Sequence, residues 1–294
     1  MPPDNNARPD RAAQAQAGLL VLPDKEFEII RQMVKAQTGI SLSLHKRDLV
    51  VSRLARRLRA LGMDSFAQYV EYLRAGESGG ELVHMINRIT TNKTDFFREN
   101  HHFVFLRDKL LPPLAAEGEK SGQRVLRAWS AGCSSGEEPY SIAITLSEFF
   151  ANHPGWDYKL LASDLDTVML EKASRGQYEP GLLEPVPKAL LGKYFDRQGR
   201  DEEAQYRVKP SLRQMITFRK FNLMHPTYPL AVPLDFVFCR NVLIYFDMED
   251  KISILTKFHR VLKPGGHIFV GHSESLMMVK DLFRFVDTTV YRKL

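Results

Sequence analysis

The chain has 294 residues, of which 44% are hydrophobic, and this is enough to form the buried cores of two domains. Lys and Arg outnumber Asp and Glu by 41 to 35, which favours an acidic partner without fixing its class. No apolar run approaches the ~20 residues of a membrane helix, and the N-terminus lacks a signal-peptide pattern, so we expect a cytoplasmic protein. Cys133 and Cys239 are too few for a disulfide framework and have no Cys or His partner at zinc spacing, so no metal is predicted.

The first third of the chain predicts a tail followed by helices. Residues 1–21 contain almost no large apolar side chain and are expected to be disordered. Apolar residues recur at helical spacing over residues 22–94, which predicts a small all-helical domain. The predicted inward faces contain Phe27, Ile30, Met33 and Val34, then Val50, Leu54, Leu58 and Leu61, then Phe66, Tyr69, Val70 and Leu73, and finally Leu82, Met85 and Ile89. Ser65 is predicted to cap the third of these helices.

A connection and a second domain are predicted to follow. Residues 95–122 would form a helix from about Asp95 to Leu111, stopped by Pro112 and Pro113, and then a polar linker. Residues 123–294 alternate strands with helices, which predicts an α/β fold with a doubly wound, mostly parallel sheet that binds ligands at the carboxyl ends of its strands. The expected strands are 125–129, one ending at 166, 234–239, 267–271 after a turn at 263–266, and a closing pair at 283–286 and 288–292. Residues of about 176–222 break the alternation and predict a small antiparallel insertion, with strands at 205–209 and 216–221.

A glycine turn between the first two strands predicts a nucleotide-binding βαβ unit. Gly132 and Gly136 would let the backbone approach a ligand, and Asp164 would accept hydrogen bonds from ribose hydroxyls. The turn lacks the G-x-G-x-x-G pattern, and Glu137 and Glu138 would repel a pyrophosphate at the start of the next helix. A cationic ligand such as S-adenosylmethionine, with its ammonium and sulfonium groups, is favoured instead. The alternative is an ordinary strand-to-helix turn with a capped helix.

Two further polar segments are candidate parts of the same site. Residues 90–99 lie at the predicted domain junction, and residues 239–246 follow a fully apolar strand. Strands of a parallel sheet end at one edge, so Arg240 and Asn241 should emerge on the same rim as the glycine turn. Taken singly, Thr94 could be only a helix N-cap, Arg98 only a salt-bridge donor and Tyr245 only a core side chain.

Together these segments closely resemble the chemotaxis receptor glutamate methyltransferases, the CheR family. The matching segments, in the expected order and spacing, are residues 90–99, 129–131, 136–141, 163–166, 239–246 and 271–274. The resemblance implies a class I S-adenosylmethionine-dependent methyltransferase domain of Rossmann type. It implies methyl transfer to glutamate side chains on the cytoplasmic methylation helices of chemoreceptors, with the enzyme recruited to membrane-bound receptor arrays. A substrate carboxylate is already ionised at neutral pH, since Glu titrates near ~4.3, so no general base is required.

The resemblance also implies roles for particular residues. Asp164 would bind the ribose, Glu138 rather than Glu137 would face the methionine ammonium, and the adenine would lie by Asn222 and Leu223. Arg98 and Tyr245 resemble the pair that holds the substrate carboxylate. The cofactor contacts implied in this way are Asn92, Thr94, Arg98, Glu138, Asp164, Asn222, Leu223, Arg240 and Asn241.

A basic helix predicted from about His45 to Ala60 is the candidate receptor-binding surface. Its candidate contacts are Lys46, Arg53, Arg56 and Arg57. Because successive helix residues are rotated by 100°, Lys46, Arg53 and Arg57 would form one stripe along the helix. In the family this helix is thought to contact the acidic methylation region of receptors, and the alternative is a solvated helix face. Nucleic acid is not expected as a partner, because no aromatic residues are interleaved with the basic ones.

Several points stay open at this stage. Some family members also bind a peptide at the C-terminus of a receptor through the antiparallel insertion, but the loop 196–203 has fewer glycines than such a member should have. We expect a monomer. A signalling adaptor that binds the cofactor without catalysis is a second hypothesis, which intact Arg98, Arg240 and Tyr245 disfavour. A nucleic-acid methyltransferase is a third, and it lacks the Asn/Asp-Pro-Pro-Tyr motif.

Overall fold

The computed structural model describes residues 20–76, 80–199 and 204–294, so most of the predicted disordered tail lies outside the described residues. Within these ranges the chain divides into two compact units, the first formed by the described residues up to 37 and from 42 to 89, and the second by residues 38–41 and the described residues from 90 onwards. Within the described ranges, every helix is too short or too polar to cross a membrane.

The first unit is helical, as the apolar spacing predicted. Its helices are α2 (Asp24–Thr38), the short η1 (Leu44–Lys46), α3 (Arg47–Ala60), α4 (Phe66–Arg74) and α5 (Glu81–Ile89). The Ser65 hydroxyl accepts a hydrogen bond from the N–H of Gln68 at 3.3 Å, which confirms the predicted cap. Most of the predicted inward residues are buried, although Met33, Leu61 and Leu82 are only half-buried, and Ile86 was not predicted.

The helix that opens the second unit differs from the prediction. It begins at His101 and runs through α6 (His101–Phe105), the π-helical turn η2 (Leu106–Leu110) and α7 (Leu111–Ser121). Pro112 and Pro113 do not stop it, because they lie at the start of α7 directly after the π-helical turn, where the hydrogen-bond register of the helix changes and prolines can be accommodated. The polar stretch predicted as a linker is therefore largely helical, and the helix ends at Gly122 in the left-handed conformation.

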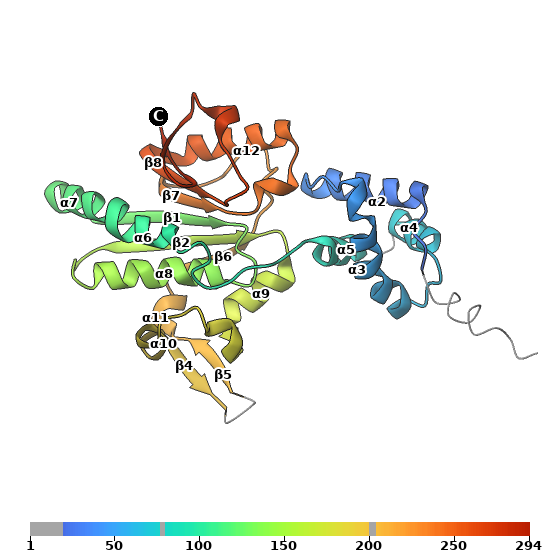
Figure 1. The fold of residues 1–294 in the computed structure, drawn as a ribbon, viewed down its shortest axis with the longest axis horizontal. Helices are drawn as coiled ribbons and strands as arrows, with labels where there is room; N and C mark the ends of the chain where they lie inside the picture. Colours follow the sequence, from blue (N-terminus) through green and yellow to red (C-terminus); the bar gives the residue numbers. More distant parts are fainter. Residues whose placement is uncertain (1–19, 77–79, 200–203) are drawn as a thin grey trace, which may run out of the picture. The chain divides into compact units, whose positions relative to one another are not determined.

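A seven-stranded sheet forms the centre of the second unit (Figure 1). Its strands, in spatial order, are β6 (Ile216–Lys220), β2 (Asp157–Asp164), β1 (Val125–Ala131), β7 (Leu234–Cys239), β8 (Leu262–Val270), β10 (Val290–Lys293) and β9 (Phe283–Asp287). The first five run parallel, and β10 pairs antiparallel with both β8 and β9. The doubly wound α/β fold is confirmed, including its closing strand pair.

One strand was assigned to the wrong sheet. Residues 216–220 were predicted in the antiparallel insertion, but β6 pairs parallel with β2 and forms an edge of the main sheet. Only one face of this edge strand is covered, with Ile216 buried and Phe218 partly buried, so its residues alternate as they would in an antiparallel strand. The predicted turn at 263–266 likewise lies within the first half of β8, where the pairing with β7 shifts register.

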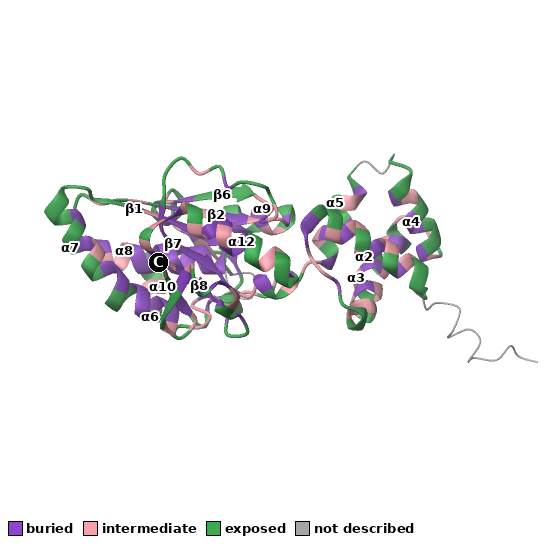
Figure 2. Cartoon of the chain, turned by 90° about the horizontal axis from the view of Figure 1, so that it is seen from above, coloured by how far each residue is buried: buried purple, intermediate pink, exposed green. Residues whose placement is uncertain are grey.

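Helices cover both faces of this sheet. α8 (Glu137–Phe150), α6, η2 and α9 (Thr167–Arg175) pack on one face, and α12 (Met248–Val261) packs on the other (Figure 1). Alternate residues of β7 enter the two cores, with Phe236 and Phe238 on the α8 side and Val237 and Cys239 on the α12 side. Figure 2 shows the resulting buried layer of strands between helices whose outer faces are exposed.

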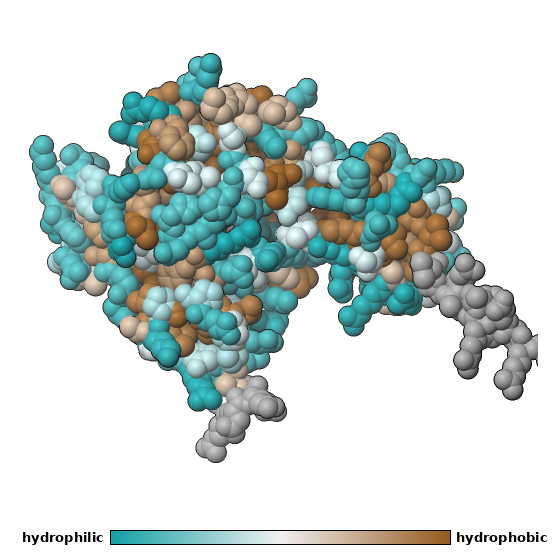
Figure 3. Space-filling model, in the orientation of Figure 1, coloured by the Kyte–Doolittle hydropathy of each residue, from teal (hydrophilic) through white to brown (hydrophobic). Residues whose placement is uncertain are grey.

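A small antiparallel sheet confirms the predicted insertion. It consists of β3 (Gln177–Tyr178), β5 (Gln205–Val208) and β4 (Phe195–Gln198), and η3 (Pro180–Leu183), α10 (Lys188–Tyr194) and α11 (Pro210–Arg213) flank its strands. Of the loop considered for peptide binding, residues 200–203 lie outside the described residues. The visible surface of the second unit is largely hydrophilic, with hydrophobic residues in scattered groups (Figure 3).

Candidate active site

Three neighbouring strands carry the predicted site residues to one edge of the sheet. β2, β1 and β7 are adjacent and parallel, and they end at Asp164, Ala131 and Cys239. The glycine turn, the acidic end of β2 and the Arg240 loop therefore emerge together, as the sequence predicted.

Backbone conformation explains the glycines of the turn. Gly132 has φ +89° and Gly136 has φ +102°, a region that residues with a side chain rarely occupy. A Cβ atom at Gly132 would also overlap the side chain of Val242. The N–H groups of Gly132 and Cys133 both donate to the carbonyl of Ser163, at 2.8 and 2.9 Å, so the turn folds back on the end of β2.

Asp164 joins this turn to the next helix. One carboxylate oxygen accepts from the N–H of Ser134 at 2.8 Å, and the other accepts from the N–H of Asp166 at 2.9 Å. Burial raises the pKa of Asp164, and the hydrogen bonds to the charged form oppose that shift. A carboxylate offers about four acceptor positions, so acceptor capacity remains for a ligand even though the backbone of Leu165 also hydrogen-bonds to Asp164.

Glu138 lies in a buried ion pair that the sequence did not predict. Its carboxylate accepts from the Ser130 hydroxyl at 2.7 Å and lies 3.2 Å from a guanidinium nitrogen of Arg240. Arg240 also lies 3.4 Å from the carboxylate of Glu99 and donates to the carbonyl of Arg98. Burial raises the pKa of Glu138, whereas Arg240 and Ser130 oppose that rise. Two acidic groups thus share one guanidinium, which leaves a net negative charge when both are ionised.

The segment before α6 is fastened to the sheet edge through Asp166. The side-chain amide of Asn92 donates to Asp166 at 2.8 Å, and the Ser134 hydroxyl donates to the carbonyl of Asn92 at 3.1 Å. Asp166 in turn caps α9. Asn92 therefore lies beside the glycine turn, although its own side chain already has a protein partner.

The rest of this segment is irregular. Thr94 is half-buried and is not a helix N-cap, because the helix begins only at His101. Phe97 and Glu99 adopt positive φ values of 52° and 56°, an uncommon conformation that often marks functional loops. Arg98, between them, is half-buried and donates to the carbonyl of Lys93 at 2.9 Å.

The loop after β7 contains two more candidate residues. Asn241 has φ 58°, and its N–H donates to the carboxylate of Glu274 at 2.9 Å. Tyr245 lies in the short helix η5 (Leu243–Tyr245), is half-buried, and accepts from the N–H of Ser41 at 2.8 Å through its carbonyl. Glu274 was noticed only as part of a matching motif, and its role in holding this loop was not predicted.

Asn222 and Leu223 follow the edge strand β6 and reach the same rim. The N–H of Phe221, directly before them, donates to the carbonyl of Asp164 at 3.0 Å. The carbonyl of Leu223 accepts from the ammonium of Lys257 at 2.8 Å, and the side chain of Leu223 is buried. The parallel placement of β6 therefore explains how these residues come close to Asp164.

A group of side chains beside Arg240 resembles a metal site. Glu99, His101 and His102 each offer a ligand atom, and these atoms lie within 4.8 Å of one another. However, Arg240 lies 3.4 Å from the Glu99 carboxylate, and the Thr289 hydroxyl lies 3.2 and 2.7 Å from Nε2 of His101 and His102. Burial, with Arg240 as the next cause, lowers the pKa of His102 to about 2. Arg240 and Thr289 thus occupy part of the group, whereas Oε2 of Glu99 and Nδ1 of His102 are buried without a hydrogen-bond partner among the described residues. The absence of a metal therefore stays a prediction.

The four candidate receptor-binding residues of the first unit are not equivalent. Arg57 forms an ion pair with Glu81, which is buried and also accepts from the Tyr69 hydroxyl at 2.8 Å. Arg53 donates to the carbonyl of Ile89 at 2.5 Å. Lys46 is half-buried, and burial, followed by the charge of Arg53, lowers its pKa.

Arg56 is the exposed member of these four. Arg59, which lies near it on the same helix, is exposed as well. The exposed basic groups of α3 are therefore Arg56 and Arg59, and they lie outside the predicted stripe of Lys46, Arg53 and Arg57.

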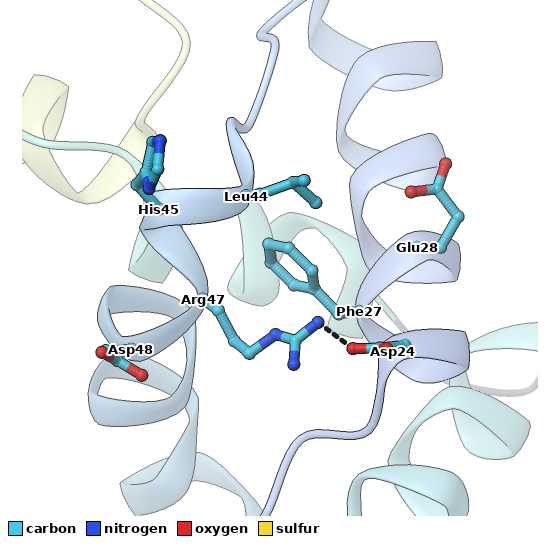
Figure 4. Close-up of a pocket in the computed structure, with 7 residues that line it drawn as sticks. All are labelled: Asp24, Phe27, Glu28, Leu44, His45, Arg47 and Asp48. Atoms are coloured by element: carbon cyan, nitrogen blue, oxygen red, sulfur yellow. Dashed lines mark hydrogen bonds and ion pairs between the residues drawn. The ribbon is translucent and has the colours of Figure 1, made fainter.

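A shallow pocket in the first unit was not predicted. Its lining consists of Asp24, Phe27, Glu28, Leu44, His45, Arg47 and Asp48 (Figure 4). Arg47 pairs with Asp24 and lies over the Phe27 ring, 5.1 Å from its centre. The pocket combines one exposed leucine with several acidic groups, and it contains none of the predicted site residues.

Comparison with known proteins assigns both units to one family. The family model of the CheR methyltransferase all-alpha domain matches residues 25–90, and that of the CheR methyltransferase SAM binding domain matches residues 92–292, where SAM is S-adenosylmethionine. The chain belongs to the CheR methyltransferases, which confirms the resemblance found in the sequence.

Curated relatives align over almost the whole chain. The chemotaxis protein methyltransferases of Salmonella typhimurium and Escherichia coli are 42% and 41% identical to it over 272 residues, which is 92% of this chain and 91% and 92% of theirs. Chemotaxis protein methyltransferase 2 of Pseudomonas aeruginosa is 42% identical over 267 residues, which is 91% of this chain and 92% of that protein.

Proposed function

We propose that this protein transfers the methyl group of S-adenosylmethionine to glutamate side chains of chemoreceptors and forms glutamate methyl esters. The observation that carries the proposal is the acidic cluster at the carboxyl edge of the sheet. This cluster contains Asp164, Glu138 and Glu99. The guanidinium of Arg240 lies between Glu138 and Glu99 and pairs with both. This surplus of negative charge suits a cationic cofactor and disfavours a phosphate-bearing one.

The groups present at this edge fit the parts of S-adenosylmethionine. The unused acceptor positions of Asp164 suit the ribose hydroxyls, and Glu138 suits the ammonium group. Gly132 gives the turn its left-handed conformation and leaves room for the side chain of Val242, which a Cβ atom there would overlap. Asn222 and Leu223, held next to β2, are proposed to border the adenine, and Asn92, Thr94 and Asn241 to complete the contacts.

The chemistry requires alignment rather than acid–base catalysis. The cofactor supplies an electrophilic methyl group, which a substrate carboxylate oxygen attacks as the carbon–sulfur bond breaks and neutral S-adenosylhomocysteine leaves. Arg98 and Tyr245 are proposed to hold the substrate carboxylate through guanidinium and hydroxyl donors. Because the carboxylate is already ionised near neutral pH, the protein contributes mainly by dehydrating and orienting the reacting pair, an effect that can reach roughly 7 to 11 kcal/mol.

The proposed receptor contact is the exposed basic part of α3. Arg56 belongs to this part, and Lys46, Arg53 and Arg57 flank it. Arg53 and Arg57 also hold the helical unit together through their contacts with Ile89 and Glu81. The proposed partners are the acidic methylation helices of chemoreceptors at the cytoplasmic side of receptor arrays, contacted by a monomer.

A second proposed contact is a receptor C-terminal peptide bound by β4, which is an edge strand of the small sheet with mostly exposed residues.

Two measurements test the proposed function together. Calorimetric titration should detect binding of S-adenosylhomocysteine, and incubation with labelled S-adenosylmethionine and receptor-containing membranes should give methyl incorporation that mild alkali releases. Normal cofactor binding without any methyl ester on chemoreceptors would indicate an adaptor. Alkali-stable methylation of nucleic acid would point to a different acceptor.

A further inference from the structure

A buried carboxylate lies behind the loop that contains Asn241 and Tyr245. Glu274 is only 7% exposed. Its carboxylate accepts from the N–H groups of Gly271 at 2.5 Å, Asn241 at 2.9 Å and Ile244 at 3.3 Å. Three backbone donors thus converge on one acidic side chain.

These donors come from the ends of two adjacent parallel strands. Asn241 and Ile244 belong to the loop after β7, and Gly271 directly follows β8. A Cβ atom at Gly271 would overlap the side-chain amide of Asn241, so the two chain segments are in close contact. Glu274 therefore fastens the loop after β7 to the end of β8.

The loop needs such a fastening. Asn241 has φ 58°, a conformation that L-residues adopt at a cost and keep only when the surroundings hold them there. The hydrogen bonds that the N–H groups of Asn241 and Ile244 donate to Glu274 hold the loop at two points. Tyr245 is the residue directly after the second of these points. A looser loop would move both Asn241 and Tyr245 relative to the cofactor site.

We propose that Glu274 is a positioning residue that sets the conformation of the Asn241–Tyr245 loop for cofactor and substrate binding. This inference rests on the proposed function, which places Asn241 and Tyr245 in the site. Glu274 itself acts from behind the loop, through backbone hydrogen bonds, and we assign it no contact with either reactant.

The same sheet offers a matched control for a purely structural role. Asp235 is 8% exposed and lies near the start of β7, at the opposite edge from the site. Its carboxylate accepts from the N–H of Arg127 at 2.8 Å and from the ammonium of Lys263 at 2.6 Å. Asp235→Asn therefore removes a similarly buried and hydrogen-bonded charge without touching the site.

The variant Glu274→Gln keeps the size of the side chain but replaces one acceptor oxygen with an amide donor that faces a backbone N–H. We expect its dissociation constant for S-adenosylhomocysteine to rise about tenfold or more, whereas Asp235→Asn should bind like wild type. Hydrogen exchange at the amides of Asn241, Ile244 and Gly271 should accelerate in Glu274→Gln and not in Asp235→Asn.

Equal affinity and equal loop exchange in the two variants would overturn the inference. Failure of wild type to bind S-adenosylhomocysteine would instead overturn the proposed function, so the two outcomes are distinguishable. If Glu274→Gln does not fold, Glu274→Asp retains the charge and withdraws the carboxylate by one methylene. It should show the same selective loss of cofactor affinity, and unchanged affinity in this folded variant would also refute the positioning role.

Discussion

At the site, most candidate side chains already have partners within the protein. The Asp164 carboxylate holds the N–H groups of Ser134 and Asp166, and Glu138 holds Arg240. The sequence identified Asp164, Glu138 and Arg240 but not these pairings, because the contacts of Asp164 with Ser134 and of Glu138 with Arg240 join residues 30 and 102 positions apart in the chain. Chain position indicated only that they share an edge of the sheet.

Replacing Asp164 by Ala should weaken S-adenosylhomocysteine binding roughly ten- to a hundredfold, because a charge-assisted hydrogen bond contributes ~1.5 to 3 kcal/mol. Isothermal titration calorimetry measures this change directly. Asp157→Ala is the matched control, since Asp157 starts the same strand, is exposed and pairs with Arg127. Equal affinity of the Asp164 variant and wild type would place the ribose elsewhere.

The Arg57–Glu81 pair is expected to contribute to stability. Glu81 is 1% exposed, so removal of its guanidinium partner leaves a buried charge without its ion pair, while the hydrogen bond from the Tyr69 hydroxyl remains. Because Arg57 is itself partly exposed, we expect Arg57→Ala to cost about 1 to 3 kcal/mol, less than a fully buried pair. Denaturant unfolding followed by circular dichroism would measure the loss, and Arg56→Ala should lie within about 0.5 kcal/mol of wild type.

Among the elements, those with regular apolar periodicity were predicted correctly. Elements that depart locally from a regular pattern were not. The helices of the first unit and the strand 234–239 follow from their patterns, and their observed bounds agree with the prediction. The helix through Pro112 and Pro113 could not be predicted, because a π-helical turn before them sets which N–H groups are needed. Strand β6 was misassigned because an edge strand alternates in the same way in either kind of sheet.

Helix α3 gives a test of receptor docking that avoids its structural residues. We expect Arg56→Glu/Arg59→Glu to slow receptor methylation without changing affinity for S-adenosylhomocysteine, because both side chains are exposed. Wild-type methylation should also slow as ionic strength rises and the ~10 Å screening length at 0.1 M shortens, and the double variant should lose much of that dependence.

The control for this experiment is Lys25→Glu/Arg74→Glu, which makes the same change of net charge at exposed positions of α2 and α4. It should methylate receptors faster than the α3 variant. If both double variants match wild type in low salt, α3 is only a solvated face, and another surface must hold the receptor.

For the whole molecule, the two units can be followed separately during unfolding. Both tryptophans, Trp129 and Trp156, lie in the second unit, so their fluorescence reports the methyltransferase unit alone. The same unit contains His102 and His267, whose pKa values burial lowers to about 2 and about 4. Tryptophan fluorescence can therefore measure how these rings link stability to pH.

The sign of this linkage follows from the two states. A histidine titrates near 6.5 when unfolded, so between pH 6.5 and about 4 the unfolded chain binds protons that the folded chain does not, and stability falls as pH falls. Buried carboxyl groups such as Glu138, whose pKa is raised, act in the opposite direction. The dependence of the wild-type unfolding free energy on pH is therefore the sum of these opposing contributions. Its difference from the curve of a histidine variant isolates the contribution of that histidine.

We expect His102→Gln to reduce the decline of unfolding free energy with falling pH between 6 and 4 by up to about 1.4 kcal/mol per pH unit, the effect of one proton. Glutamine can still hydrogen-bond to the Thr289 hydroxyl, which lies 2.7 Å from His102, so the fold should survive the exchange. His267→Gln should act in the same direction. Urea unfolding at a series of pH values, followed by tryptophan fluorescence, would measure both slopes. A His102 variant with the wild-type slope would mean that the ring is protonated in the folded protein despite its burial beside Arg240, His101 and His272.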